Sequence, residues 1–224
     1  HGLVDYLYIL QKKVVNKFYV VFAGNYQKFL DKRNISSINV QGYFEKEDML
    51  IGFPVPKIEI DITKNGAYTK CAMILLDSSE IFNVPDVFWI RFLERCITEI
   101  KDAEKYNIII KPHPGQSNET LALVSDFCKG KNNITLLSDP LQVSMSFESI
   151  YISNRDKVDY IFSTYSAAEL YLANFFDEGT KFCFLHEFIK PYYIKGPKQY
   201  ADAFTELEPY INEVFSSKAC KFLS

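Results

Sequence analysis

Short apolar runs alternate with amphipathic segments along most of this chain, which is the pattern of a parallel sheet covered by helices. Two early runs predict strands at residues 18–24 and 38–43, with a short helix between them. A second series predicts five further strands, at residues 71–77, 107–111, 134–138, 159–163 and 181–185. The pattern therefore predicts a Rossmann-like α/β fold, a doubly wound parallel sheet.

The amphipathic segments between these strands predict the covering helices. After Pro85, which suits the first turn of a helix, apolar residues recur at helical spacing from Trp89 to Ile100. Further helices are predicted at about 118–129, 146–153 and 167–176. The last segment, YINEVFSSKACKFL, is predicted to be an amphipathic helix.

Residues 44–70 separate the two series, because they are rich in charge and contain prolines that interrupt helices. We interpret residues 1–67 as the end of one domain plus a linker, and residues 68–224 as a second domain. The chain begins with His1 instead of methionine, so we interpret it as a fragment of a longer protein.

Composition narrows the functional classes. Hydrophobic residues make up 48% and charged residues 24%, which is typical of a globular protein. The net charge of -3 gives no overall attraction for nucleic acid, which is therefore not an expected partner. Five scattered cysteines without a C-x-x-C pair favour reduced thiols. Since neither a signal peptide nor an apolar run long enough to span a membrane is visible, we expect a cytoplasmic protein.

Polar side chains gather after three strands of the second series. Ligands of doubly wound sheets bind beyond the carboxyl ends of the strands, which all lie at one edge. The polar groups are Ser78 and Ser79 at the first strand end, Lys111, His113 and Pro114 at the second, and Ser163, Thr164 and Ser166 at the fourth.

His113 is the candidate catalytic residue at this edge. Imidazole titrates near neutral pH, so His113 can donate a proton to a leaving phosphate. Ser166 opens a predicted helix, whose N-terminal N–H groups favour an anion. Simpler interpretations stay open: His113 satisfies a hydrogen bond, and Ser166 and Thr164 only cap the helix. Glu148 either accepts hydrogen bonds from a ribose or is a solvated surface charge.

Several ligand classes lack their sequence motif. The chain has no G-x-G-x-x-G after the first strand and no G-x-x-x-x-G-K-[ST], so dinucleotide and P-loop sites are not predicted. It has no Asp-x-Asp motif and only three histidines, so neither a metal-bridged diphosphate nor a histidine-rich zinc site is predicted. We therefore expect no metal and no cofactor.

The ordered motifs KPHP, FES and FSTYSAAELYL resemble those of bacterial sialyltransferases and capsular polysialyltransferases of the GT-B type. The resemblance covers about residues 68–190. It implies a metal-independent glycosyltransferase that moves a sialic-acid-like sugar from a CMP-sugar donor to a glycan acceptor in capsule polysaccharide biosynthesis. Residues 68–224 would then be the nucleotide-binding half, and residues 1–67 the remnant of the acceptor-side half. Peripheral association with the inner membrane fits this resemblance, and the oligomeric state stays open.

The resemblance also implies roles for individual residues. His113 would meet the donor phosphate and act as general acid, with Lys111 and Pro114 near the cytosine. Glu148 would bind the ribose.

The serine motif departs from the family pattern. Ser166 matches the first serine of a Ser-Ser pair, whereas the second position is Ala167. Ser163 or Thr164 can compensate for the missing hydroxyl, and Ser78 is a further candidate contact.

The general base leaves alternatives open. In the sialyltransferases it lies in a D/E-D/E-G motif of the first domain, and Gly2 is interpreted as the end of that motif. KPHP and the HG pair at residues 1–2 also resemble CDP-glycerol glycerophosphotransferases of teichoic-acid synthesis, in which His1 would be the base. A third alternative is a nucleotide-binding fragment that is inactive alone, since a GT-B site lies between two domains.

Overall fold

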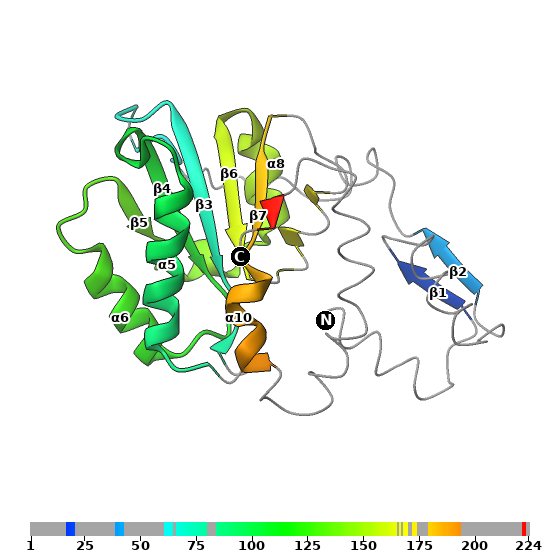
Figure 1. Ribbon diagram of the computed structural model, residues 1–224. Coiled ribbons are helices and arrows are strands. Elements are labelled where there is room, and N and C mark those ends of the chain that lie inside the picture. The colour runs from blue at the N-terminus through cyan, green and yellow to red at the C-terminus, as the bar shows by residue number, and fades with distance from the viewer. Residues whose placement is uncertain are drawn as a thin grey trace.

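The computed structural model describes residues 17–20, 39–42, 61–64, 66–79, 84–164, 166, 168–169, 172–173, 179–193 and 221–222. Within these residues, six parallel strands form one sheet in the order β5-β4-β3-β6-β7-β8 (Figure 1). Two further strands, β1 (Lys17–Val20) and β2 (Asn39–Gly42), pair in parallel as a separate sheet.

Helices alternate with the strands of the large sheet. The strands are β3 (Lys70–Leu76), β4 (Tyr106–Pro112), β5 (Ile134–Leu136), β6 (Val158–Ser163), β7 (Lys181–Phe184) and β8 (Lys221–Phe222). The helices are α5 (Val87–Glu99), α6 (Asn118–Cys128), α7 (Pro140–Ser144), α8 (Phe147–Asn154) and α10 (His186–Tyr193), with short 3-10 helices η1 (Ala103–Lys105) and η2 (Arg155–Lys157). In Figure 1, α5 and α6 cover one face of the sheet and α8 the other.

The direction of strand addition reverses beside β3. Along the chain, β4 and β5 are added on one side of β3, whereas β6, β7 and β8 lie on its other side. This is the Rossmann order, and it confirms the predicted doubly wound fold. The reversal places a topological switch point between β3 and β6, and ligands of such sheets bind beyond the carboxyl ends of the strands at that point.

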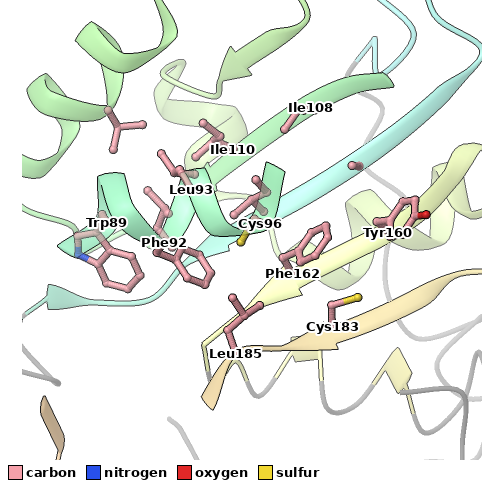
Figure 2. Close-up of a cluster of buried hydrophobic side chains, with 14 of the residues drawn as sticks. Trp89, Phe92, Leu93, Cys96, Ile108, Ile110, Tyr160, Phe162, Cys183 and Leu185 are labelled. Atoms are coloured by element: carbon pink, nitrogen blue, oxygen red, sulfur yellow. The ribbon is translucent and has the colours of Figure 1, made fainter. Parts of the chain in front are cut away.

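The face covered by α5 carries a large aromatic core. Alternate strand residues point to this face, among them Ile110 of β4 and Phe162 of β6. Figure 2 shows them beside Trp89 and Phe92 of α5, whose rings meet edge to face at 5.7 Å. The apolar stripe predicted for this helix is confirmed, and it fixes α5 against the strands whose ends carry the candidate site.

The intervening strand residues face the opposite core. Met73 of β3 and Ile109 of β4 pack with Phe147 and Ile150 of α8. Ile62 belongs to the same cluster, and its carbonyl accepts a hydrogen bond from Asn107 Nδ2 at 2.8 Å. The division of the chain at residues 67 and 68 stays a prediction.

The helix predicted for the last segment of the chain contains a short strand, β8, near its end. β8 pairs with β7 through Cys183↔Lys221 and Phe184↔Phe222, so the helix predicted over the last segment is wrong at these positions. An open strand edge binds any extended segment through its free N–H and C=O groups, and a short apolar run does not distinguish helix from strand. The remainder of that segment lies outside the described residues.

Two observed helices have no counterpart among the predicted ones. α7 begins at Pro140, and the carboxylate of Asp139 accepts hydrogen bonds from the N–H groups of Leu141 and Gln142. α10 contains Pro191, which argues against a helix at sequence level. No helix of the described residues is both long and apolar enough to cross a membrane.

Candidate functional site

The polar strand ends predicted from the sequence lie side by side around the switch point. β3 is hydrogen-bonded to β4 on one side and to β6 on the other. Neighbouring strands are about 4.8 Å apart, so residues that follow β4 and β6 are about 10 Å apart at the backbone. One phosphate with its hydrogen-bonding partners can bridge such a gap.

Asp77, directly after β3, lies at the centre of this arrangement. The hydroxyl of Thr164, directly after β6, donates a hydrogen bond to Asp77 Oδ2. On the other side, the charge of Asp77 acts on the imidazole of His113 and tends to raise its pKa. The sequence prediction missed Asp77, although the rule that selected Ser78 and Ser79 applies equally to this carboxylate.

His113 lies in the turn after β4 with its side chain exposed to solvent. The backbone N–H of Gly115 donates to its Nδ1 at 3.0 Å. Since a backbone N–H can only donate, Nδ1 carries no proton and the neutral ring presents Nε2–H as its donor. Partial desolvation by the surrounding protein lowers the pKa of His113 below its ordinary value; the charge of Lys111 acts in the same direction, and Asp77 opposes both.

Gly115 and Pro114 complete this turn. Glycine can adopt a positive φ that other residues avoid, but the φ of Gly115 is not in the left-handed region. A Cβ at this position would lie 3.4 Å from Nδ1 of His113, which is an ordinary contact. Pro114 is exposed.

Lys111 is buried, with 5% of the residue exposed. Its Nζ donates to the carbonyl of Val143, in α7, at 2.9 Å. Burial lowers the pKa of Lys111 to about 8, against the influence of Glu148, which raises it. Burial likewise raises the pKa of Glu148, and Lys111 lowers it. Lys111 and Glu148, two of the predicted nucleoside contacts, are therefore close enough to influence each other electrostatically, with Lys111 buried and Glu148 half-buried.

The end of β6 is built from buried hydroxyls. Ser163 and Thr164 are fully buried, whereas Ser166 is half-buried. Ser163 Oγ accepts a hydrogen bond from the N–H of Ser166 at 3.2 Å, which is the geometry of a helix cap. Residues 168–169 and 172–173, described in the segment that follows, are helical. Ser163 is thus the residue with a capping geometry, and Ser166 presents its side chain near the surface.

A buried carboxyl group lies behind this turn. Glu169 is fully buried, and burial raises its pKa well above the ordinary value, while hydrogen bonds from Ser163 and the backbone of Cys183 act to lower it. The Cys183 N–H donates to Glu169 Oε1 at 3.0 Å. The sequence prediction did not single out Glu169.

Two predicted site residues, Ser78 and His1, remain to be placed. Ser78 is buried at 5% exposure, at the same strand end as Asp77. His1 lies outside the described residues. Among the residues that the structure describes, no group of three or more His, Cys, Asp and Glu side chains is arranged to hold a metal ion.

Comparison with known families provides an independent line of evidence. The sequence profile of the alpha-2,8-polysialyltransferase family matches residues 33–185, more than half of the chain. The chain belongs to the alpha-2,8-polysialyltransferase family. A comparison with individual curated proteins finds no match.

Membership in the polysialyltransferase family makes this chain a glycosyltransferase of the sialyltransferase type, with a nucleotide-sugar donor and a glycan acceptor as substrates. The matched range contains the carboxyl ends of β3, β4 and β6, where the candidate site lies, and it excludes His1. The family resemblance expected from KPHP and FSTYSAAELYL is therefore confirmed.

Proposed function

We propose that this polysialyltransferase-family chain transfers a sialic-acid-like sugar from a CMP donor to a surface glycan, without a metal ion, with the donor phosphate beyond β3, β4 and β6. The observation that carries this proposal is the convergence of His113 and Thr164 on Asp77 at the switch point. The Rossmann order makes this edge the expected place for a nucleotide.

His113 is proposed to protonate the donor phosphate. When the bond from the anomeric carbon to the phosphate oxygen breaks, both electrons stay on that oxygen, and the imidazolium proton moves to it. The acceptor hydroxyl forms the new bond to the anomeric carbon and loses its proton to a base.

In the unliganded protein His113 is neutral with the proton on Nε2, so the second proton must come with donor binding. A phosphate within hydrogen-bonding distance favours the imidazolium and raises the pKa. Protonation of Nδ1 then displaces the N–H of Gly115.

Other residues are proposed to hold the nucleotide. The Ser166 hydroxyl, with Ser163 and Thr164 behind it, faces the phosphate, and hydrogen-bond donors at a helix N-terminus stabilise the growing negative charge. Lys111, Glu148 and Pro114 lie on the side proposed for the nucleoside. Ser78 is a further proposed contact at β3. These proposals place nucleotide binding in the large sheet and leave the acceptor to the residues outside it.

The first test replaces His113 by alanine in the full chain. We expect the transfer rate from labelled CMP-sialic acid, measured with EDTA present, to fall about 10²–10⁴-fold, the usual contribution of a general acid. The unfolding midpoint should stay close to that of the unmodified protein, because the side chain is exposed. Undiminished turnover in a folded His113→Ala protein would refute the acid role.

Calorimetric titration of the full chain with CMP, CDP and UMP tests the nucleotide. Preference for CMP supports the sialyl donor, whereas preference for CDP favours glycerophosphate transfer. Nucleotide binding without transfer would identify an inactive nucleotide-binding fragment.

A further inference from the structure

Gln116, in the loop between β4 and α6, is hydrogen-bonded to both strand ends that carry the charged groups of the site. Its backbone N–H donates to the carbonyl of His113 at 3.0 Å. Its side-chain Nε2 donates to the carbonyl of Asp77 at 3.2 Å. Only 8% of the residue is exposed, so these bonds are shielded from water.

The other end of the Gln116 amide is bound by Ser79. Oε1 accepts from the backbone N–H of Ser79 at 3.1 Å and from its hydroxyl at 2.9 Å. The indole Nε1 of Trp89 in turn donates to the hydroxyl of Ser79 at 2.7 Å. Because indole and backbone N–H groups can only donate, this chain of bonds has one direction, which fixes the orientation of the amide.

This network is anchored in the core. Trp89 is fully buried in α5 and packs edge to face on Phe92. Thr120 of α6 is also fully buried; its hydroxyl lies 3.4 Å from that of Ser79 and donates to Asp86 at 2.6 Å. Buried networks whose members all have partners are rigid, and losing one member leaves others unpaired.

We propose that Gln116 is a positioning residue, which fixes the distance between Asp77 and the imidazole of His113. The catalytic consequence rests on the proposed function, whereas the arrangement of the two groups does not. Gln116 ties the backbone of His113 to the end of β3 through the carbonyls of His113 and Asp77, and in the unliganded chain Gly115 also holds the imidazole.

Two substitutions separate the contribution of the Gln116 Oε1 acceptor from that of its Nε2 donor. Gln116→Met keeps the length of the side chain and removes every side-chain hydrogen bond. Gln116→Glu keeps an acceptor for Ser79 but loses the donor to the carbonyl of Asp77. The matched control is Asn133→Leu, because Asn133 Nδ2 also bridges two carbonyls, those of Ala103 and Tyr106, at the opposite end of β4.

The first measurement is the imidazole pKa in the unliganded full chain by NMR, with the His113 signal identified by its loss in His113→Ala. Two described groups influence this pKa, Asp77 from β3 and Lys111 from β4, in addition to desolvation. Desolvation is the largest influence, so Gln116→Met, which lets the turn open, should raise the pKa toward its ordinary value. Asn133→Leu should leave it unchanged.

The second measurement is turnover with CMP-sialic acid. We expect Gln116→Met to lower kcat about 10–100-fold with little change in the donor KM, because a misplaced acid affects the transition state most. Gln116→Glu should fall between Gln116→Met and the unmodified chain, and it serves as the test protein if Gln116→Met does not fold.

Distinct outcomes separate this inference from the proposed function. If both Gln116 variants lose stability as Asn133→Leu does while the pKa of His113 and kcat stay unchanged, Gln116 is merely structural and the inference is overturned. If the unmodified chain does not transfer from CMP-sialic acid, the proposed function fails, and the NMR titration still decides whether Gln116 positions His113.

Discussion

Lys111 illustrates how far a single residue can be interpreted from sequence. The resemblance of KPHP to the sialyltransferase motif predicts that Lys111 contacts the nucleotide, but the sequence does not say which way the side chain points. In β4, Lys111 comes two residues after Ile109, and residues two apart in a strand share a face, which here is the face covered by α8. Its Nζ donates a hydrogen bond to the carbonyl of Val143. A lysine at this depth changes protonation at moderately alkaline pH, which gives the folded chain a measurable pH dependence.

We expect the unmodified chain to gain stability relative to Lys111→Met as pH rises from about 8 to about 10.5. The compared quantity is the free energy of unfolding of the unmodified chain minus that of Lys111→Met. The pKa of Lys111 is lowered from 10.5 to about 8, so the unfolded chain binds more protons in this range and stability rises with pH. The lysine contribution should change by at most about 3 kcal/mol. Urea unfolding of both proteins across this range measures it, and a constant difference would contradict the lowered pKa.

At the level of elements, the serine caps of α8 and of the helical segment after β6 differ in burial and in the other groups that the capping hydroxyl contacts. Ser146 caps α8 by accepting from the N–H of Ser149 at 3.2 Å; it is exposed, and its hydroxyl lies 2.7 Å from that of Ser149. Ser163 makes the corresponding bond to Ser166, but it is fully buried and also bonds to the carboxyl group of Glu169. The loss of Ser163 therefore also removes a partner from a buried acid.

We expect Ser163→Ala to lower the free energy of unfolding by about 2 kcal/mol and Ser146→Ala by about 1 kcal/mol. Chemical denaturation of the two variants under the same conditions provides the comparison. Equal losses would mean that the bond to Glu169 contributes no more than the contact between the hydroxyls of Ser146 and Ser149.

The helices and strands that the sequence predicts are those whose apolar residues recur at a regular spacing. Strands β3, β4, β6 and β7 and helices α5, α6 and α8 occupy the expected places, because their apolar residues repeat over enough positions to define a face. The two-residue strand β8 shows no such repeat, and its conformation is decided by the edge of β7. Local pattern thus predicts elements that form their own apolar face, and it fails where a neighbour supplies the partner.

For the whole molecule, sequence predicted which strand ends are polar but not how they are arranged. His113, Ser163, Thr164 and Ser78 follow from the rule that ligands bind at carboxyl ends. The strand order that places β3 between β4 and β6 depends on long-range pairing, so the position of Asp77 between the ends of these two strands was not predicted. Gln116 had no signal at all, because its partners are mostly backbone groups of a distant strand end.

This arrangement predicts where a nucleotide slows hydrogen exchange in the full chain. With CMP at 100 times its Kd, amides of residues 77–79, 113–117 and 163–164, which lie at the carboxyl edge, should exchange up to about 100-fold more slowly. Amides of residues 103–106 and 131–134 lie at the opposite edge and should be unaffected. Cytidine, which has no phosphate, should protect residues 113–117 less than CMP does. Protection confined to the opposite edge would move the nucleotide away from His113, and equal protection by cytidine would remove the phosphate from this turn.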